Sequence, residues 1–184
     1  MLVMHAMNFA IKKHGDQKRK YTNTPYWLHP AEVAGIVGTV PGVTVEMIAA
    51  SWLHDVVEDT DTSLVEIHSL FGSEVCRLVR GLTDVSRPEH GSRAIRKAMD
   101  RDHLAGGCWK IQTIKMADII SNTACIMACD EPFARVYIPE KRALLDALTL
   151  AHPTLRRLAA SQVGLNPANY GSVLELLFPA DLQE

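Results

Sequence analysis

Apolar residues recur along the chain at the three- and four-residue spacing of amphipathic helices, and no strand-like alternation lasts for more than a few residues. Thr44 stands where a helix-capping side chain is expected, and Gly15 and the Gly106-Gly107 pair stand where helices should end. The clearest helical stretches span 2–13, 45–57, 92–104 and 109–129. We therefore predict an all-α fold.

Proline and glycine divide the rest of the chain into shorter helices. His29-Pro30 predicts a helix with proline at its first position, which would leave His29 accessible at the helix mouth. Ser63 has the spacing of a capping residue and starts a short helix that Gly72 should end. A last apolar segment covers 173–178. Three further prolines suit first helical positions: Pro132, Pro139 and Pro153.

Length and charge narrow the class of protein. A chain of 184 residues with 47% hydrophobic and 22% charged residues suits one domain over residues 1–184. No apolar run approaches the roughly 20 residues that span a bilayer, and no leader pattern opens the chain, so we expect a cytoplasmic protein without a membrane partner. A net charge of −2 argues against a nucleic-acid partner.

Basic residues are nevertheless concentrated in two clusters. Such clusters suit a small polyanion, although solvated helix faces are the plainer alternative. The clusters are Lys12, Lys13, Lys18, Arg19 and Lys20, and then Arg93, Arg96, Lys97 and Arg101.

The four cysteines form no Cys-x-x-Cys pair, which favours buried free thiols over a structural zinc site. They are Cys76, Cys108, Cys125 and Cys129.

The end of the apolar stretch 45–57 and the two residues after it carry one imidazole and three carboxylates. These are His54, Asp55, Glu58 and Asp59. On a helix, Asp55 would sit about 100° round from His54, with Glu58 one turn beyond His54 and Asp59 one turn beyond Asp55. Carboxylates at this end oppose the helix dipole by roughly 0.3 to 1 kcal/mol each. A surface ion pair followed by a solvated turn would explain the pattern, but clustered unfavourable groups are typical of functional sites.

Asp118 falls on or beside the apolar stripe of the predicted helix 109–129, and Asn122 follows one turn later. A buried carboxylate is costly unless it is paired or bound to a metal. Together with His29, His54 and Asp55, Asp118 gives a mixed nitrogen and oxygen ligand set from three helices. Manganese or iron suits that set, and zinc is an alternative.

The pattern His29…His54-Asp55…Asp118 resembles the four-ligand motif of the HD-domain metal-dependent phosphohydrolases. The likeness runs from about His14 to Asn122, and we expect no synthetase or regulatory domain in the remainder, as in stand-alone small alarmone hydrolases. The surrounding residues are similar to the hydrolase domain of bifunctional alarmone synthetase-hydrolases: Tyr26-x-x-His29-Pro30, Leu53-His54-Asp55-Val56-Val57-Glu58-Asp59-Thr60, Phe71-Gly72, Gly81-Leu82-Thr83 and Lys115-Met116-Ala117-Asp118-x-x-x-Asn122.

This resemblance implies an HD-domain bundle of about eight to ten helices and a role for each motif residue. Glu58 and Asp59 would handle the attacking water, Arg19 and Lys20 would meet the nucleotide, and Asn122 would lie near the ribose or phosphate. The implied metal is one divalent cation, manganese above all, and its implied ligands are His29, His54, Asp55 and Asp118.

The implied reaction is hydrolysis of the 3′-pyrophosphate of (p)ppGpp or (p)ppApp, which releases pyrophosphate and a nucleoside 5′-di- or triphosphate. The alternatives are a 5′-nucleotidase, an NADPH 2′-phosphatase and a non-catalytic alarmone-binding sensor. The Glu58-Asp59 pair argues against a 5′-nucleotidase, because HD enzymes of other classes generally lack it at this place. Tyr26 is read as a packing residue that could also line the pocket, and Tyr137 as a weaker candidate for substrate contact. A nucleotide is the expected partner, and assembly into a homo-oligomer is left open.

Overall fold

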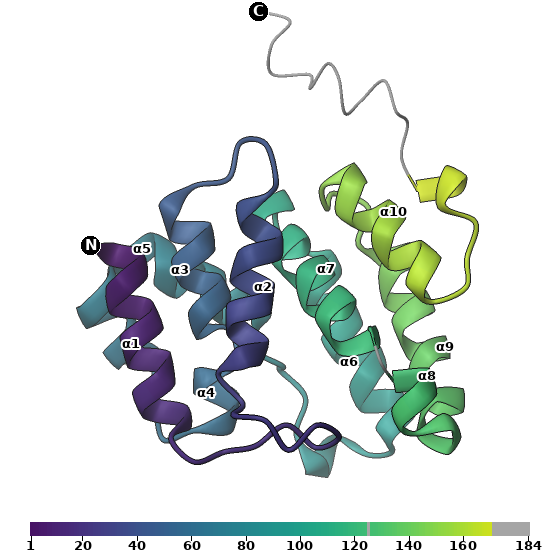
Figure 1. The fold of residues 1–184 in the computed structure, drawn as a ribbon, viewed down its shortest axis with the longest axis horizontal. Coiled ribbons are helices and arrows are strands. Elements are labelled where there is room, and N and C mark those ends of the chain that lie inside the picture. Colours follow the sequence, from purple (N-terminus) through teal and green to yellow (C-terminus); the bar gives the residue numbers. More distant parts are fainter. Residues whose placement is uncertain (125, 171–184) are drawn as a thin grey trace, which may run out of the picture.

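The computed structural model describes residues 1–124 and 126–170, and within them the chain is helical apart from turns, loops and one isolated β-bridge (Figure 1). The described part contains ten α-helices and two short 3-10 helices, which confirms the all-α prediction. None of its helices is long and apolar enough to cross a membrane. Two parts of the sequence analysis, the segment 173–178 and Cys125, lie outside the described residues.

The helices follow one another in the order α1 (Leu2–His14), α2 (Leu28–Gly38), α3 (Val45–Leu53), α4 (Val56–Asp59), α5 (Leu64–Leu82), α6 (Arg93–Ala105), α7 (Trp109–Thr123), α8 (Ile126–Cys129), α9 (Glu131–Ala147) and α10 (Pro153–Gln162). The 3-10 helices are η1 (Pro88–His90) and η2 (Pro167–Tyr170).

Two helices organise the packing. Helix α3 contacts α1, α2 and α5, while α7 contacts α2 and α10, so α2 and α7 lie side by side where the two halves of the chain meet (Figure 1). Ala49, Ala50 and Leu53 of α3 and Ile114 and Ala117 of α7 are fully buried. Their alanines let neighbouring helices approach closely, so polar side chains near the start of α2, at the end of α3 and within α7 can meet.

The predicted helix 45–57 ends earlier than expected. Thr44 caps it as predicted, accepting a hydrogen bond from the Met47 amide, but α3 stops at Leu53 and α4 begins only at Val56. Asp55 occupies the bridge region of the backbone map, with φ −100° and ψ −8°, between the two helices. His54 and Asp55 therefore form a turn at a helix junction, not a face of one long helix.

Other helix limits differ from the sequence prediction at the prolines. Helix α2 begins at Leu28, so Pro30 is its third residue, and Pro132 is the second residue of α9. Pro139 lies inside α9, where it removes the hydrogen bond to the carbonyl of Arg135. Arg135 is exposed, so water can hydrogen-bond that carbonyl.

Three further predicted helix limits can be compared directly with the structure. Pro153 opens α10 as predicted, whereas α7 ends at Thr123 and not at Cys129. Gly72 breaks the helical path of α5 with φ +85°, a conformation that a residue with a β-carbon rarely adopts.

Candidate metal centre and active site

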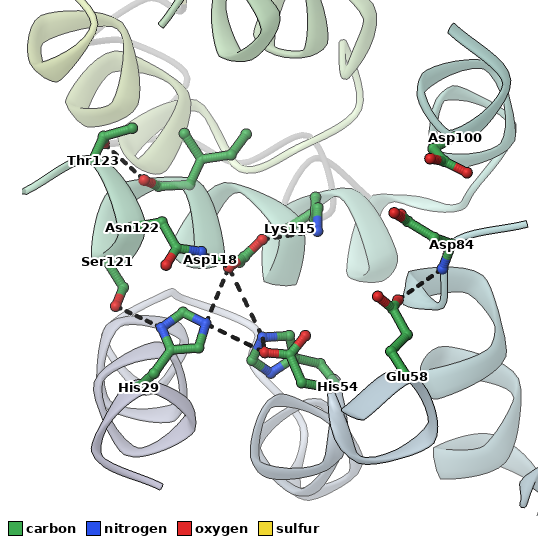
Figure 2. A network of polar contacts seen from close by, with 12 residues as sticks. His29, His54, Glu58, Asp84, Asp100, Lys115, Asp118, Ser121, Asn122 and Thr123 are labelled. Carbon is green, nitrogen blue, oxygen red and sulfur yellow. Dashed lines mark hydrogen bonds and ion pairs between the residues drawn. The ribbon is translucent and has the colours of Figure 1, made fainter. Parts of the chain in front are cut away.

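Four side chains from α2, the α3–α4 junction and α7 converge in the interior, and we call His29, His54, Asp55 and Asp118 the His-Asp cluster. Figure 2 shows His29, His54 and Asp118 close together. His29 Nε2 lies 3.2 Å from Asp118 Oδ1 and 3.5 Å from Asp55 Oδ2. His54 Nε2 lies 3.0 Å from Asp55 Oδ2. One ligand atom each from His29, His54 and Asp55 falls within 4.8 Å of the others, a spacing that can hold a metal ion.

Burial of the cluster corrects one expectation. His29 is only 2% exposed, so it is not accessible at a helix mouth as its position beside Pro30 suggested. His54 and Asp118 are 2% and 4% exposed. The reason is that α7 packs against α2. The face of α7 that carries Asp118 covers the start of α2, where His29 lies.

The tautomer of His54 follows from its hydrogen bond to the backbone. Its Nδ1 lies 2.8 Å from the Ser51 carbonyl oxygen, which can only accept, so Nδ1 carries a proton. Its Nε2 is buried and has no hydrogen-bond partner. Burial would lower the pKa of His54, but the negative charges of Asp55 and Asp118 outweigh it and raise the pKa to about 9. A buried nitrogen facing carboxylates fits a cation between them.

A relay of hydrogen bonds orients His29. Its Nδ1 lies 2.9 Å from Ser121 Oγ (Figure 2), and the Ser121 hydroxyl donates to Glu32 Oε2 at 2.6 Å. Because that hydroxyl has given its only proton to Glu32, it accepts the Nδ1 proton of His29. The His29 Nε2 lone pair is then left facing the cluster. Arg19 completes the relay with an ion pair to Glu32 at 2.8 Å.

The two aspartates of the cluster are held as anions. Burial opposes ionisation of Asp118, but Lys115 Nζ at 2.8 Å from Asp118 Oδ2 keeps the pKa of Asp118 well below its usual value. Asn122 donates from its side-chain amide to the other oxygen of Asp118. The Tyr26 hydroxyl donates to Asp55 Oδ2 at 2.6 Å. Two imidazole nitrogens and two carboxylates thus form a mixed donor set of the kind that binds divalent transition metals.

Glu58 and Asp59 both lie on α4 but point to different neighbours. Glu58 Oε1 accepts a hydrogen bond from the Asp84 amide at 2.7 Å, and Asp59 Oδ2 accepts one from Gln17 Nε2 at 3.1 Å. Burial, followed by the charge of Asp84, raises the pKa of Glu58 to about 7. Among the contacts of the described chain, no hydrogen bond or ion pair joins either carboxylate to the His-Asp cluster. They flank the cluster instead of forming part of it.

A pocket of about 250 Å³ opens on one side of the cluster, and we call it the aromatic pocket. It brings together the three side chains that the sequence assigned to the nucleotide, Arg19, Lys20 and Asn122. Tyr26 also lines it, so this tyrosine is not only a packing residue. The other lining residues are Tyr21, Thr22, His29, Ile126, Phe133 and Tyr137.

A larger hollow of about 550 Å³ lies between α6 and α9, and we call it the basic groove. Glu58 and Lys115 stand at its inner end. Part of the second basic cluster found in the sequence lines it, so that cluster is not merely a solvated helix face. The other charged residues of its lining are Asp84, Arg93, Lys97, Asp100, Arg101, Glu140 and Lys141.

The sequence did not assign the supporting contacts that Lys115, Ser121 and Glu32 make with the cluster. The role of Lys115, which the sequence shows only as part of a motif, could have been found, because it stands three residues before Asp118 on the same helix. The Ser121–Glu32 contact joins residues 89 positions apart, and no local pattern announces it. The cysteine prediction holds for Cys76, which is buried, but Cys129 is exposed.

Comparison with known proteins gives consistent matches. The sequence profile of the HD domain family matches residues 6–123, a stretch that includes the whole His-Asp cluster. The guanosine-3′,5′-bis(diphosphate) 3′-pyrophosphohydrolase MESH1 of Danio rerio is 37% identical over 131 residues, which cover 70% of this chain and 71% of that protein. A probable guanosine-3′,5′-bis(diphosphate) 3′-pyrophosphohydrolase of Synechocystis sp. is 38% identical over 130 residues, which cover 66% of this chain and 16% of that protein.

A solved structure agrees with these sequence matches. It is that of a metazoan ortholog of SpoT that hydrolyses ppGpp, and it superposes with a TM-score of 0.77 at 28% identity. The superposition covers 88% of this chain and 93% of that one.

Proposed function

Because the chain belongs to the HD domain family, we propose that it hydrolyses the 3′-pyrophosphate of ppGpp and releases pyrophosphate and GDP. One observation carries this proposal: a relative of matching length with that activity in its name is 37% identical over a stretch that spans 70% of the chain. The buried His-Asp cluster between a nucleotide-sized pocket and Glu58 supports it. The relatives' names specify guanosine nucleotides, so ppGpp is the substrate to test first and ppApp the second. We also propose that residues 1–184 form a single HD domain.

The proposed cofactor is one manganese ion held by His29, His54, Asp55 and Asp118. The fit rests on the buried, unpartnered Nε2 of His54 and on the carboxylates that face it. A divalent cation bound there would lower the pKa of a water molecule and polarise a phosphoryl oxygen.

The nucleoside part of the substrate is proposed to occupy the aromatic pocket. Tyr137 and Phe133 offer ring faces to the base, with ring centroids 5.3 Å apart. Arg19 and Lys20 lie at the pocket wall, where their charges suit the 5′-diphosphate. Asn122 donates to Asp118 and lines the same pocket, which would place it between the ribose and the cluster.

Glu58 is proposed to take a proton from the attacking water. With a pKa of about 7, a large fraction of Glu58 is ionised at neutral pH, and the same group can return the proton. Attack on the phosphorus that carries the ribose O3′ breaks the P–O3′ bond, and O3′ leaves with a proton from Glu58 or from solvent. Asp59, held by Gln17, would help to orient the water from the other side of α4.

Product analysis tests this proposal. The protein loaded with Mn²⁺ is incubated separately with ppGpp, ppApp, NADPH and a deoxynucleoside monophosphate, and the products are separated by ion-exchange chromatography. We expect pyrophosphate and GDP from ppGpp, and no turnover by Asp55→Ala. Orthophosphate from NADPH or from the monophosphate would instead indicate another HD hydrolase. The proposal fails if no pyrophosphate appears from ppGpp or ppApp, or if Asp55→Ala is as active as the unaltered chain.

A further inference from the structure

The basic groove and the aromatic pocket lie on opposite sides of the His-Asp cluster. His29 and Asn122 line the aromatic pocket, whereas Glu58 and Lys115 line the groove. Figure 2 shows this separation, with Asn122 on one side of Asp118 and Lys115 and Glu58 on the other. A molecule that spans the cluster therefore has one end in each hollow.

The cations of the groove differ in how they are neutralised. Arg93 is paired with Glu140 at 2.7 Å, Lys97 with Asp84 at 2.8 Å, and Lys115 with Asp118 at 2.8 Å. Arg101 lies 3.6 Å from Asp102.

Lys141 is the exception among these cations. Within the part of the chain that the structure describes it forms no ion pair, and its Nζ lies over the Tyr137 ring, 4.6 Å from the centroid. Burial, followed by the repulsion of Lys115, lowers the pKa of Lys141 to about 8. A cation in a groove that has no carboxylate paired with it is stabilised by an anion that enters from outside.

We propose that the basic groove binds the terminal phosphate of the 3′-diphosphate, and that Lys141 is the specificity-determining residue that distinguishes a 3′-diphosphate from a 3′-monophosphate. This proposal rests on the proposed function, because it assigns the far end of the same substrate. It also makes the groove the route by which pyrophosphate leaves.

The direction of the reaction supports this assignment. Water must approach the phosphorus opposite the ribose O3′, and with the nucleoside in the aromatic pocket that side faces Glu58. The second phosphate is bonded through an oxygen to the same phosphorus, so it would lie beyond the cluster, where Lys115 and Lys141 line the groove wall. The contact between Lys141 and Tyr137 joins the two hollows, since Tyr137 also lines the aromatic pocket.

The test separates the two ends of the substrate by using the two products as probes. Binding of pyrophosphate and of GDP is measured by calorimetry at a fixed free Mn²⁺ concentration, for the full chain and for Lys141→Gln and Lys141→Met. We expect both variants to weaken pyrophosphate binding roughly tenfold to a hundredfold, as removal of a charge-assisted contact does, and to leave GDP binding unchanged. The kcat/KM of both variants for ppGpp should fall by a similar factor. Any kcat/KM for the 3′-monophosphate ppGp should stay unchanged.

Two further variants serve as controls. Lys141→Arg keeps the charge and should retain most of the pyrophosphate affinity. Arg135→Gln removes an exposed cation from the same helix, which among the described residues is paired only with Glu131, and should change neither binding constant. Lys141→Gln and Lys141→Met should not lower the midpoint of thermal unfolding, because they remove a charge that burial and Lys115 disfavour and that has no ion-pair partner in the described chain.

The outcomes distinguish this proposal from the proposed function. If ppGpp is hydrolysed and pyrophosphate binds equally well to the Lys141 variants, the groove proposal is overturned and the proposed function stands. If pyrophosphate binding depends on Lys141 but ppGpp is not hydrolysed by any variant or by the unaltered chain, the proposed function fails and the anion site remains.

Discussion

Ser121 provides a sharp test of how the cluster is organised, because it touches a candidate metal ligand without belonging to the ligand set. Its hydroxyl accepts the Nδ1 proton of His29 and donates to Glu32. Ser121→Ala removes both contacts and leaves the buried Nδ1–H of His29 without a partner. His29 is then free to rotate or to carry its proton on the nitrogen that should face the metal.

The size of the effect follows from the contacts that are lost. A buried donor without a partner costs about 1 to 3 kcal/mol of folding stability. Loss of the group that orients a metal-binding histidine weakens metal affinity by about ten- to a hundredfold, or about 1.4 to 2.7 kcal/mol. We expect Ser121→Ala to show both losses.

The assay is Mn²⁺ binding by calorimetry, with urea unfolding measured on the same samples. Thr123→Val is the matched control, since Thr123 is a buried hydroxyl on the same helix that bonds Ile119 and Gln162 instead of the cluster (Figure 2). It should lose stability by a similar amount and keep its Mn²⁺ affinity. The reasoning is refuted if Ser121→Ala binds Mn²⁺ as tightly as the unaltered chain, or if Thr123→Val weakens binding equally.

Three further predictions concern protons and packing. Because the pKa of His54 is about 9 without metal, Mn²⁺ binding at pH 7.5 should release about one proton. The affinity for Mn²⁺ should therefore rise by up to tenfold per pH unit below pH 9. Calorimetry in buffers of different ionisation enthalpy measures the number of protons released. The pKa of Glu58 is about 7 in the folded chain, above its ordinary value of 4.5, so ionisation of Glu58 costs folding stability as the pH rises from about 4.5 to 7, and the loss is complete above that range. In chelator, Glu58→Gln should therefore be more stable than the unaltered chain at pH 8, by about 1 kcal/mol after allowance for solvent screening, and equally stable at pH 4.5; equal urea midpoints at pH 8 would contradict this. A β-carbon at Gly81 would overlap Ile111 Cδ1, so Gly81→Ala should cost about 1 to 3 kcal/mol in urea unfolding, and Ile111→Val should recover part of that loss if the overlap is its cause.

The sequence predicts the helical class and many helix ends because those depend on local patterns. Thr44 and Ser63 act as the expected caps, and Gly72 interrupts the helical path as its position indicated. The cluster of His29, His54, Asp55 and Asp118 also assembles as the motif suggested. Motif residues are recognisable one by one, so convergence in space could be expected from the resemblance.

Features that depend on contacts between distant segments were not predictable. Nothing local in the sequence distinguishes Lys141 from the other basic residues of α9, Arg135 and Arg142, or places it opposite Lys115, since Lys141 and Lys115 meet only when α9 packs near α7. The same holds for the burial of His29, which depends on α7 covering α2. Pro139 misled the helix prediction because proline usually begins or ends a helix, whereas here α9 continues through it.

The early end of α3 explains why one short motif can serve two sides of a site. In a helix continuous through residue 57, Asp55 would be rotated about 100° from His54 around the helix axis. At the junction, the two side chains instead meet at 3.0 Å, and the chain re-enters a helix at Val56. That second start carries Glu58 past the cluster to the basic groove. The turn at His54-Asp55 therefore places the candidate metal ligands toward the nucleotide pocket and the candidate base toward the side from which water must attack.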